Sequence, residues 1–375
     1  METRRASVFA LATYIGTIMG VGLFGLPYVA AQAGFGLVVL YLLLGGAIAL
    51  MVNRMFASVA VHTQGHHRLP GYAAQYLGSW GKPSAFLVQI LGLYGALLGY
   101  LIVGGQFLAG LLGGSVILYT FIFFIFGALI IWRGTSSIGP VELILLFIFF
   151  AIIILLFVSG ASHINHDNFK VIDWTHFFVP YGVVLFSLWG ASIIPEIREQ
   201  LQGDFKKIGR VIVWGLIICA AVYLAFTYLI LGVSGSETTS DAISGLQRVL
   251  GTNVLKIGYI FGLITTFTSF ITLGLTIQKL FWYDYRIPKF RSWMLAVFVP
   301  LVVFVLGLQD FISVIGMTGA ITLGLDGVLV TLIFLQLKKR QQSPRLSSYR
   351  LLGSALIGLL LLGVALELFY SIKGF

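Results

Sequence analysis

An apolar segment near the N-terminus is interrupted by four glycines and a proline. It reads Ile15-Gly16-Thr17-Ile18-Met19-Gly20-Val21-Gly22-Leu23-Phe24-Gly25-Leu26-Pro27 and lies within a stretch long enough to cross a bilayer. Glycine costs about 1 kcal/mol and proline about 3 kcal/mol in a helix interior. At membrane depth, a broken helix is tolerated where it is packed in protein or lines a cavity. The segment therefore predicts either a broken spanning helix beside a ligand site or close helix packing by small residues.

Composition places the whole chain in a membrane. Of its 375 residues, 59% are hydrophobic and only 10% are charged, whereas soluble domains carry about 25% charged residues. A spanning helix needs about 20 apolar residues, and no stretch resembles a separate soluble domain. We therefore expect an all-α membrane protein, a single polytopic domain over 1–375, with eleven spans near 6–31, 36–58, 84–111, 114–132, 138–159, 178–200, 210–233, 254–280, 292–308, 312–337 and 349–371.

Lys and Arg predict the orientation of these spans. With a cytoplasmic N-terminus and an external C-terminus, 19 of the 23 Lys and Arg residues fall on the cytoplasmic side, as the positive-inside rule requires. We expect a multi-pass protein of the plasma (inner) membrane. The net charge of +10 then follows from topology, so the expected partner is the lipid bilayer and not a nucleic acid. No sequence feature predicts an oligomeric state.

A second apolar segment, at 178–200, is interrupted by glycines and a proline around Trp189. The two interrupted segments hold corresponding positions in two halves of five spans each, 6–159 and 178–337, with 349–371 as an additional span. Because five is odd, the second half must be inserted upside down relative to the first. Interrupted helices at matching positions of inverted repeats indicate the binding site of a secondary transporter.

Three stretches resemble amino acid permeases of the amino acid/polyamine/organocation superfamily. Gly20–Gly36 resembles the first span of these permeases, and Phe186–Glu196 resembles their sixth span. Thr268–Leu275 is similar to the eighth span of tryptophan/tyrosine permeases in the amino acid/auxin permease branch, with one residue fewer after Phe270. The resemblance implies a LeuT-like five-plus-five inverted repeat, with discontinuous spans 1 and 6, that works by alternating access.

The two breaks supply the groups that a free amino acid needs. A half-helix that begins near Gly20 offers N–H donors and a positive dipole end to the carboxylate, and carbonyls freed by the breaks can accept from the ammonium. Aromatic side chains form a wall or gate, or else simply pack between helices. With no Arg, Lys or Glu expected in the pocket, large neutral amino acids are favoured. The predicted substrate-binding residues are Ile15, Gly16, Met19, Gly20, Val21, Gly22, Tyr100, Phe186, Ser187, Leu188, Trp189 and Gly190.

Two coupling ions fit the sequence. Asp326 lies near the centre of the tenth span, where a charge is expensive, and burial that disfavours its charged form makes it a candidate proton acceptor. Thr265, Thr268 and Ser269 share one face of the eighth span. In sodium-coupled LeuT-like proteins, similar hydroxyls bind sodium together with carbonyls of the first break, here those of Gly16 and Met19. We favour the proton, and we expect no other cofactor and no metal site.

Glu196 follows Pro195 in the inner part of the sixth span. It is a candidate partner for Arg198 or a member of an inner gate. Its neighbours along the chain give no further guide to its role.

Three functional classes compete for this chain. The favoured one is a secondary active transporter that takes up neutral aromatic or branched amino acids, with proton coupling preferred to sodium coupling. A non-transporting amino acid receptor on the same fold, like a spore-germinant receptor subunit, shares the ligand site and stays open as an alternative. An enzyme is not expected, because the sequence has no HExxH, GxSxG or paired acidic motif.

Overall fold

The computed structural model describes residues 2–65, 67–134, 139–170 and 172–373. In this part of the chain the regular structure is helical throughout. The α-helices are α1 (Glu2–Ile18), α2 (Gly22–Ala33), α3 (Phe35–His62), α4 (Leu69–Leu77), α5 (Gly81–Leu112), α6 (Val116–Arg133), α7 (Gly139–Gly160), α8 (Val179–Leu188), α9 (Ile194–Gln200), α10 (Phe205–Ser234), α11 (Gln247–Lys279), α12 (Lys289–Val305), α13 (Phe311–Met317), α14 (Gly324–Arg340) and α15 (Leu346–Lys373).

Short helices of other types join or interrupt these α-helices. Among them are the π-helices η8 (Leu280–Asp284) and η9 (Thr318–Leu323). The 3₁₀ turns are η1 (Gly78–Trp80), η2 (Ala161–His163), η3 (His166–Phe169), η4 (Trp174–His176), η5 (Ala191–Ile193), η6 (Gly235–Glu237) and η7 (Ser244–Leu246).

The helices follow the eleven predicted spans closely. Within the described residues, eight helices are long and apolar enough to cross a membrane, or nine when the bent pair α1–α2 counts as one span. The other two predicted spans coincide with α7 and with α12, which has 17 residues. The predicted start of the fifth span, residue 138, lies outside the described residues. The chain is therefore a multi-pass membrane protein.

The first span is broken where the glycines predicted a break. The axes of α1 and α2 differ by 51°, and Met19, Gly20 and Val21 lie between the two helices. The end of α2 is set by Gly34, whose φ of 107° is a conformation that residues with a Cβ rarely adopt. One bilayer-length segment thus forms two half-helices whose ends meet inside the bundle.

The sixth span is interrupted at Trp189. Helix α8 ends at Leu188, Trp189 has an extended backbone (φ −81°, ψ 109°), and η5 leads into α9. A proline lies at the start of α8 and another at the start of α9. Proline lacks a backbone N–H, and in the first turn of a helix that group has no intrahelical partner in any case. Both predicted discontinuities are confirmed. The tenth span contains the π-helical segment η9 between α13 and α14, and the sequence analysis did not predict it.

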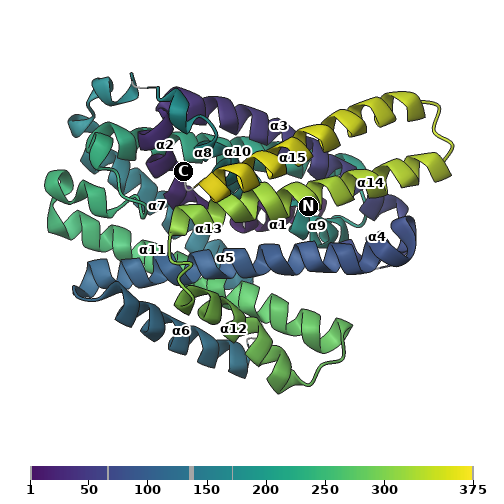
Figure 1. Cartoon of the computed structure of the whole chain (residues 1–375), viewed down its shortest axis with the longest axis horizontal. Coiled ribbons are helices and arrows are strands. Elements are labelled where there is room, and N and C mark those ends of the chain that lie inside the picture. The colour runs from purple at the N-terminus through teal and green to yellow at the C-terminus, as the bar shows by residue number, and fades with distance from the viewer. Residues whose placement is uncertain (1, 66, 135–138, 171, 374–375) are drawn as a thin grey trace.

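The broken helices lie at the centre of the bundle. Helix α2 packs against α8 and α10, and α8 packs in turn against α3, α13 and η9. Figure 1 shows α5 extending along nearly the whole molecule, with α6, α11 and α12 beside it. The structure does not test the predicted repeat boundaries, so the division into 6–159 and 178–337 stays a prediction.

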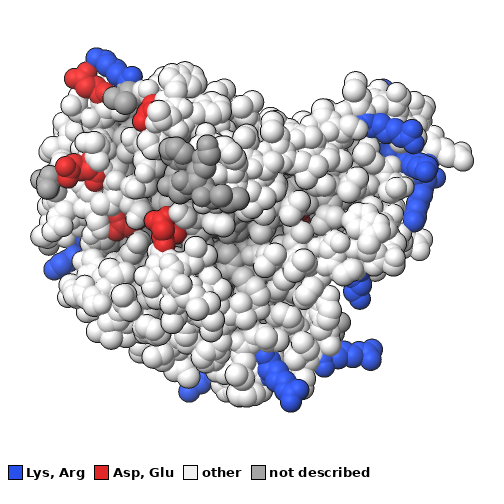
Figure 2. Space-filling view, viewed as in Figure 1, with Lys and Arg blue, Asp and Glu red and all other residues white. Residues whose placement is uncertain are grey.

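The two ends of the bundle differ in charge. Figure 2 shows most of the visible Lys and Arg at the right-hand end and lower edge of this face, while Asp and Glu gather toward the left.

At the start of α10, the carboxylate of Asp204 accepts hydrogen bonds from the backbone of Lys206 and Lys207. Hydrogen bonds from the backbone and side chain of Lys207 lower the pKa of Asp204.

Candidate substrate and ion cavities

Two cavities of about 140 Å³ each meet at the broken helices. The first, the central cavity, is lined by Thr17, Ile18, Gly20, Gly22, Phe56, Arg68, Leu69, Val88, Gln89, Gly92, Leu93, Ala96, Tyr100, Phe186, Trp189, Ala191, Ser192, Leu273, Leu323 and Asp326. The second, the hydroxyl cavity, is lined by Gly16, Thr17, Met19, Tyr100, Phe149, Thr265, Thr268, Ser269, Thr272 and Leu273. Tyr100 of α5 lines both cavities, as do Thr17 and Leu273.

The structure divides the predicted substrate residues into three groups. Five of them share the central cavity, namely Gly20, Gly22, Tyr100, Phe186 and Trp189. Gly16 and Met19 line the hydroxyl cavity instead. The remaining predicted residues line neither cavity, and these are Ile15, Val21, Ser187, Leu188 and Gly190.

The glycines of the first break make room mainly for protein neighbours. A Cβ on Gly20 would overlap the phenol oxygen of Tyr100, and one on Gly22 would overlap the hydroxyl of Ser187 and lie 2.9 Å from its Cα. Gly16 differs, since a Cβ there would meet no atom within 4 Å. Small-residue packing, the alternative considered from the sequence, therefore explains Gly22, while Gly16 borders open space in the hydroxyl cavity.

The carbonyls expected to be free are partly occupied. The carbonyl of Ile15, one of the predicted substrate-binding residues, accepts from the backbone N–H of Met19 at 2.8 Å, so the break does not leave it without a partner. The phenol of Tyr223 on α10 lies 2.8 Å from the carbonyl oxygen of Ser187 and 2.7 Å from that of Ile18. One fully buried hydroxyl thus joins the two breaks.

Tyr223 was missed in the sequence analysis. Its signal was present, because a tyrosine in the middle of an apolar span needs a hydrogen-bond partner for its hydroxyl. The partners are backbone carbonyls. Every residue has one, so the sequence does not indicate which carbonyls the hydroxyl contacts.

Asp326 and Trp189, 137 residues apart in the chain, are joined by a hydrogen bond. The indole N–H of Trp189 donates to Oδ2 of Asp326 at 2.8 Å, and both residues are buried and line the central cavity. Asp326 lies in the first turn of α14, directly after the π-helix η9. The carboxylate predicted for ion coupling is therefore in direct contact with the aromatic residue predicted for the substrate wall.

Threonine hydroxyls line the other cavity. Those of Thr265 and Thr268 donate to carbonyls of their own helix, α11, which leaves oxygen lone pairs directed elsewhere. Ser269 and the backbone of Val21 lie close to the Tyr100 phenol. The three predicted hydroxyl residues do share one cavity, and oxygen ligands of this type suit a hard cation.

A basic side chain at the central cavity corrects two predictions. Arg68 lines this cavity, although no pocket Arg was expected there. Its Nη2 lies 2.9 Å from Oε1 of Glu196, so the partner of Glu196 is Arg68 and not Arg198. Arg198 instead donates to backbone carbonyls of the α3–α4 connection.

Two discontinuous spans that meet around a buried cavity define the class of LeuT-like membrane transport proteins. The solved structure of MhsT in complex with L-phenylalanine has this fold in common with the chain. The TM-score is 0.64 at 15% identity, and the match covers 95% of this chain and 98% of MhsT.

The sequence model of the tryptophan/tyrosine permease family matches residues 4–370, and the chain belongs to that family. Tyrosine-specific transport system 1 of Haemophilus influenzae is 26% identical over 330 residues, which is 81% of each chain. The tryptophan-specific transport protein of Pseudomonas aeruginosa is 24% identical over 410 residues, 97% of this chain and 94% of its own. The protein is thus an amino acid permease and not an enzyme, as the sequence analysis predicted.

Proposed function

We propose that this permease takes up neutral aromatic or branched amino acids together with protons that move inward down their gradient. The hydrogen bond between Trp189 and Asp326 carries the proposal. A proton that binds to or leaves Asp326 changes the acceptor of the Trp189 indole, and Trp189 belongs to the wall of the central cavity. Proton movement and the shape of the substrate site are thereby linked through one contact.

Aromatic substrates are supported by the cavity wall and by the relatives. Tyr100, Phe186 and Trp189 give the central cavity aromatic surface, which suits an apolar substrate side chain. The names of two relatives specify tyrosine and tryptophan as their substrates. The half-helix α2 begins at Gly22, so its N-terminus lies beside this cavity. The positive end of the α2 dipole there favours the substrate carboxylate.

Sodium coupling is the second candidate, and the hydroxyl cavity favours it. Gly16, Thr265, Thr268 and Ser269 border this cavity, and their oxygens form a plausible ligand set for a hard cation. The two candidates involve different residues on different helices, so one set of variants separates them.

The proposed orientation places the N-terminus and the Arg68 end of the bundle in the cytoplasm, with the C-terminus outside. Its support is the distribution of Lys and Arg, most of which lie at the right-hand end and lower edge of the face shown in Figure 2. Cysteine labelling of single-cysteine variants at the two termini, in intact cells and in inverted vesicles, measures this directly.

Uptake of radiolabelled tyrosine and tryptophan into proteoliposomes tests the coupling. We expect accumulation in sodium-free buffer when an inward proton gradient is imposed. Asp326→Asn should lose accumulation but keep exchange of internal for external substrate, because an Asn oxygen can still accept from Trp189. The matched control is Glu367→Gln, which removes a carboxylate on α15 that lines neither cavity and should leave accumulation intact. Strict sodium dependence together with an active Asp326→Asn variant would refute proton coupling.

A further inference from the structure

An ion pair beside the central cavity joins the α3–α4 connection to α9, between side chains that are 53% exposed (Arg68) and 31% exposed (Glu196). Arg68 lies in the connection between α3 and α4, and Glu196 lies in the first turn of α9. Arg68 also lines the cavity, so its guanidinium is within reach of a molecule that moves along it. The ion pair therefore borders the central cavity at the end of the bundle that contains the α3–α4 connection and α4.

The pairing of these two residues is incomplete. Nη2 of Arg68 lies 2.9 Å from Oε1 of Glu196, while Oε2 of Glu196 is buried and has no hydrogen-bond partner among the described residues. A guanidinium carries five N–H donors in a fork that matches a carboxylate through two parallel bonds. A guanidinium that contacts Glu196 through Nη2 can therefore bind a second carboxylate through its other donors.

The backbone around Arg68 is held by other contacts. Arg198 donates to the carbonyls of Gly65 at 3.0 Å and Thr63 at 3.4 Å. On the opposite side of α4, Arg340 donates to the carbonyl of Gln75 at 2.8 Å and lies 4.8 Å from the ring centre of Tyr76. These contacts fix the loop and α4 independently of Glu196.

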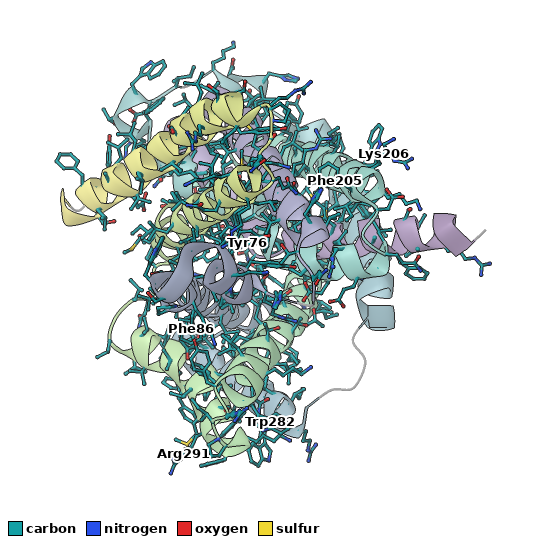
Figure 3. All side chains as sticks on the ribbon, turned by 90° about the vertical axis from the view of Figure 1, so that its right-hand side faces the viewer. Tyr76, Phe86, Phe205, Lys206, Trp282 and Arg291 are labelled. Carbon is teal, nitrogen blue, oxygen red and sulfur yellow. The ribbon has the colours of Figure 1, made fainter. Side chains whose placement is uncertain are left out.

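Figure 3 looks onto this end of the bundle. Tyr76 of α4 lies near the middle of the view, and the labelled basic residues Lys206 and Arg291 lie toward its edges. Helix α4 is therefore central at this end, and Leu69 in its first turn lines the central cavity.

A second polar group lies along the same cavity. The side chain of Gln89 on α5 lines it, and its Oε1 has no hydrogen-bond partner within the described chain. An amide oxygen accepts from an ammonium group. Arg68 and Gln89 together thus offer a donor fork and an acceptor, which are the groups that a zwitterionic amino acid needs.

We propose that Arg68 is a second binding point for the α-carboxylate of the substrate. An amino acid that moves between the helix breaks and this end of the bundle displaces Glu196 from Arg68, and Glu196 returns when the substrate has left. The inference rests on the proposed function, since it takes an amino acid as the molecule that moves through the cavity. It adds a site that is reached from one membrane face only.

Transport from the two membrane faces, measured in right-side-out and inverted vesicles, tests the assignment. For tyrosine presented on the Arg68 face, Arg68→Gln should raise KM about tenfold, the loss expected for a hydrogen bond to a charged group. Glu196→Gln should lower the same KM, because it removes the competing carboxylate. From the opposite face, both variants should change KM by less than about twofold.

The two opposite shifts distinguish this site from a structural ion pair. If Arg68 and Glu196 only held the loop in place, both variants would shift KM in the same direction, and that result would overturn the proposal. Arg198→Gln is the control, since it loosens the same loop without touching the cavity, and an equal rise in KM there would also overturn it. Tyramine, which lacks the carboxylate, should inhibit wild type and Arg68→Gln equally from the Arg68 face. Accumulation of tyrosine and tryptophan by wild-type vesicles tests the proposed function separately, because it does not depend on how the Arg68 and Glu196 variants behave.

Discussion

Gly22 lies directly against Ser187, so the start of one half-helix touches the end of another from the opposite half of the chain. A Cβ on Gly22 would overlap the Ser187 hydroxyl and approach its Cα to 2.9 Å. The two breaks are therefore one structural unit, held together by close packing. A movement of α2 relative to α8 changes this contact at once.

Gly22→Ala should weaken the protein and impair transport, because the methyl group must displace the backbone at Ser187. Overpacking of this kind costs about 1–3 kcal/mol, which a thermal-shift assay in detergent detects as a lower Tm. Gly358→Ala on α15 is the matched control. A Cβ there meets nothing within 4 Å, so the Tm of the Gly358→Ala variant should equal or exceed that of the wild type. Equal Tm values for both variants would contradict the packing explanation.

Tyr223→Phe should reduce stability and substrate affinity together. The variant removes the hydroxyl that lies between the carbonyls of Ile18 and Ser187, and a buried group left without its partner costs about 1–3 kcal/mol. Tm and the Kd for tyrosine, measured on the same purified sample, check this. The control is Tyr228→Phe on the same helix, whose hydroxyl makes a single long contact of 3.5 Å to His166. We expect no change there.

Ser269→Ala should keep most of the uptake, and the remaining uptake should be independent of sodium. The variant removes a hydroxyl close to the Tyr100 phenol, while the backbone of Val21 stays beside that phenol. Initial rates in sodium and in choline buffer provide the measurement. A severe loss that high sodium restores would instead support a sodium ion in the hydroxyl cavity.

Phe186→Ala should weaken binding of tryptophan more than binding of smaller neutral amino acids. Phe186 lines the central cavity, and the loss of aromatic surface removes contact area that only a large side chain uses. A competition panel against radiolabelled tryptophan gives the ranking. Phe290→Ala, which alters an exposed residue at the start of α12, serves as the control. If lysine or glutamate outcompeted every neutral amino acid on wild type, the aromatic assignment would be wrong.

The sequence predicted the positions of both helix breaks because backbone effects are local. Gly20, Gly22 and Pro195 disfavour a continuous helix wherever they occur, and apolar length alone predicts a span. Asp326 was identified in the same way, since a carboxylate at mid-span is costly regardless of its neighbours. The family resemblance then supplied the arrangement of the spans, which local patterns do not contain.

The contacts between distant segments could not be predicted. The hydrogen bond from Trp189 to Asp326 crosses 137 positions, and the partner of Glu196 is Arg68, although Arg198 is only two residues away. Nothing local to Glu196 distinguishes these two arginines, because the choice depends on where the α3–α4 connection lies. The contacts of Tyr223 with backbone carbonyls could not be predicted either, because they also depend on where distant segments lie.

The π-helix η9 fixes the direction in which Asp326 points. A π-helix holds one more residue in a turn than an α-helix, so every side chain after Leu323 is rotated relative to an uninterrupted α-helix. Each residue of an α-helix turns the next by about 100°. Deleting one residue from Thr318–Leu323 would restore regular helix and turn Asp326 by about that angle, away from Trp189. The spacing of the tenth span is therefore as important to this contact as the identity of its residues, and a change in length there would disconnect the carboxylate without any substitution.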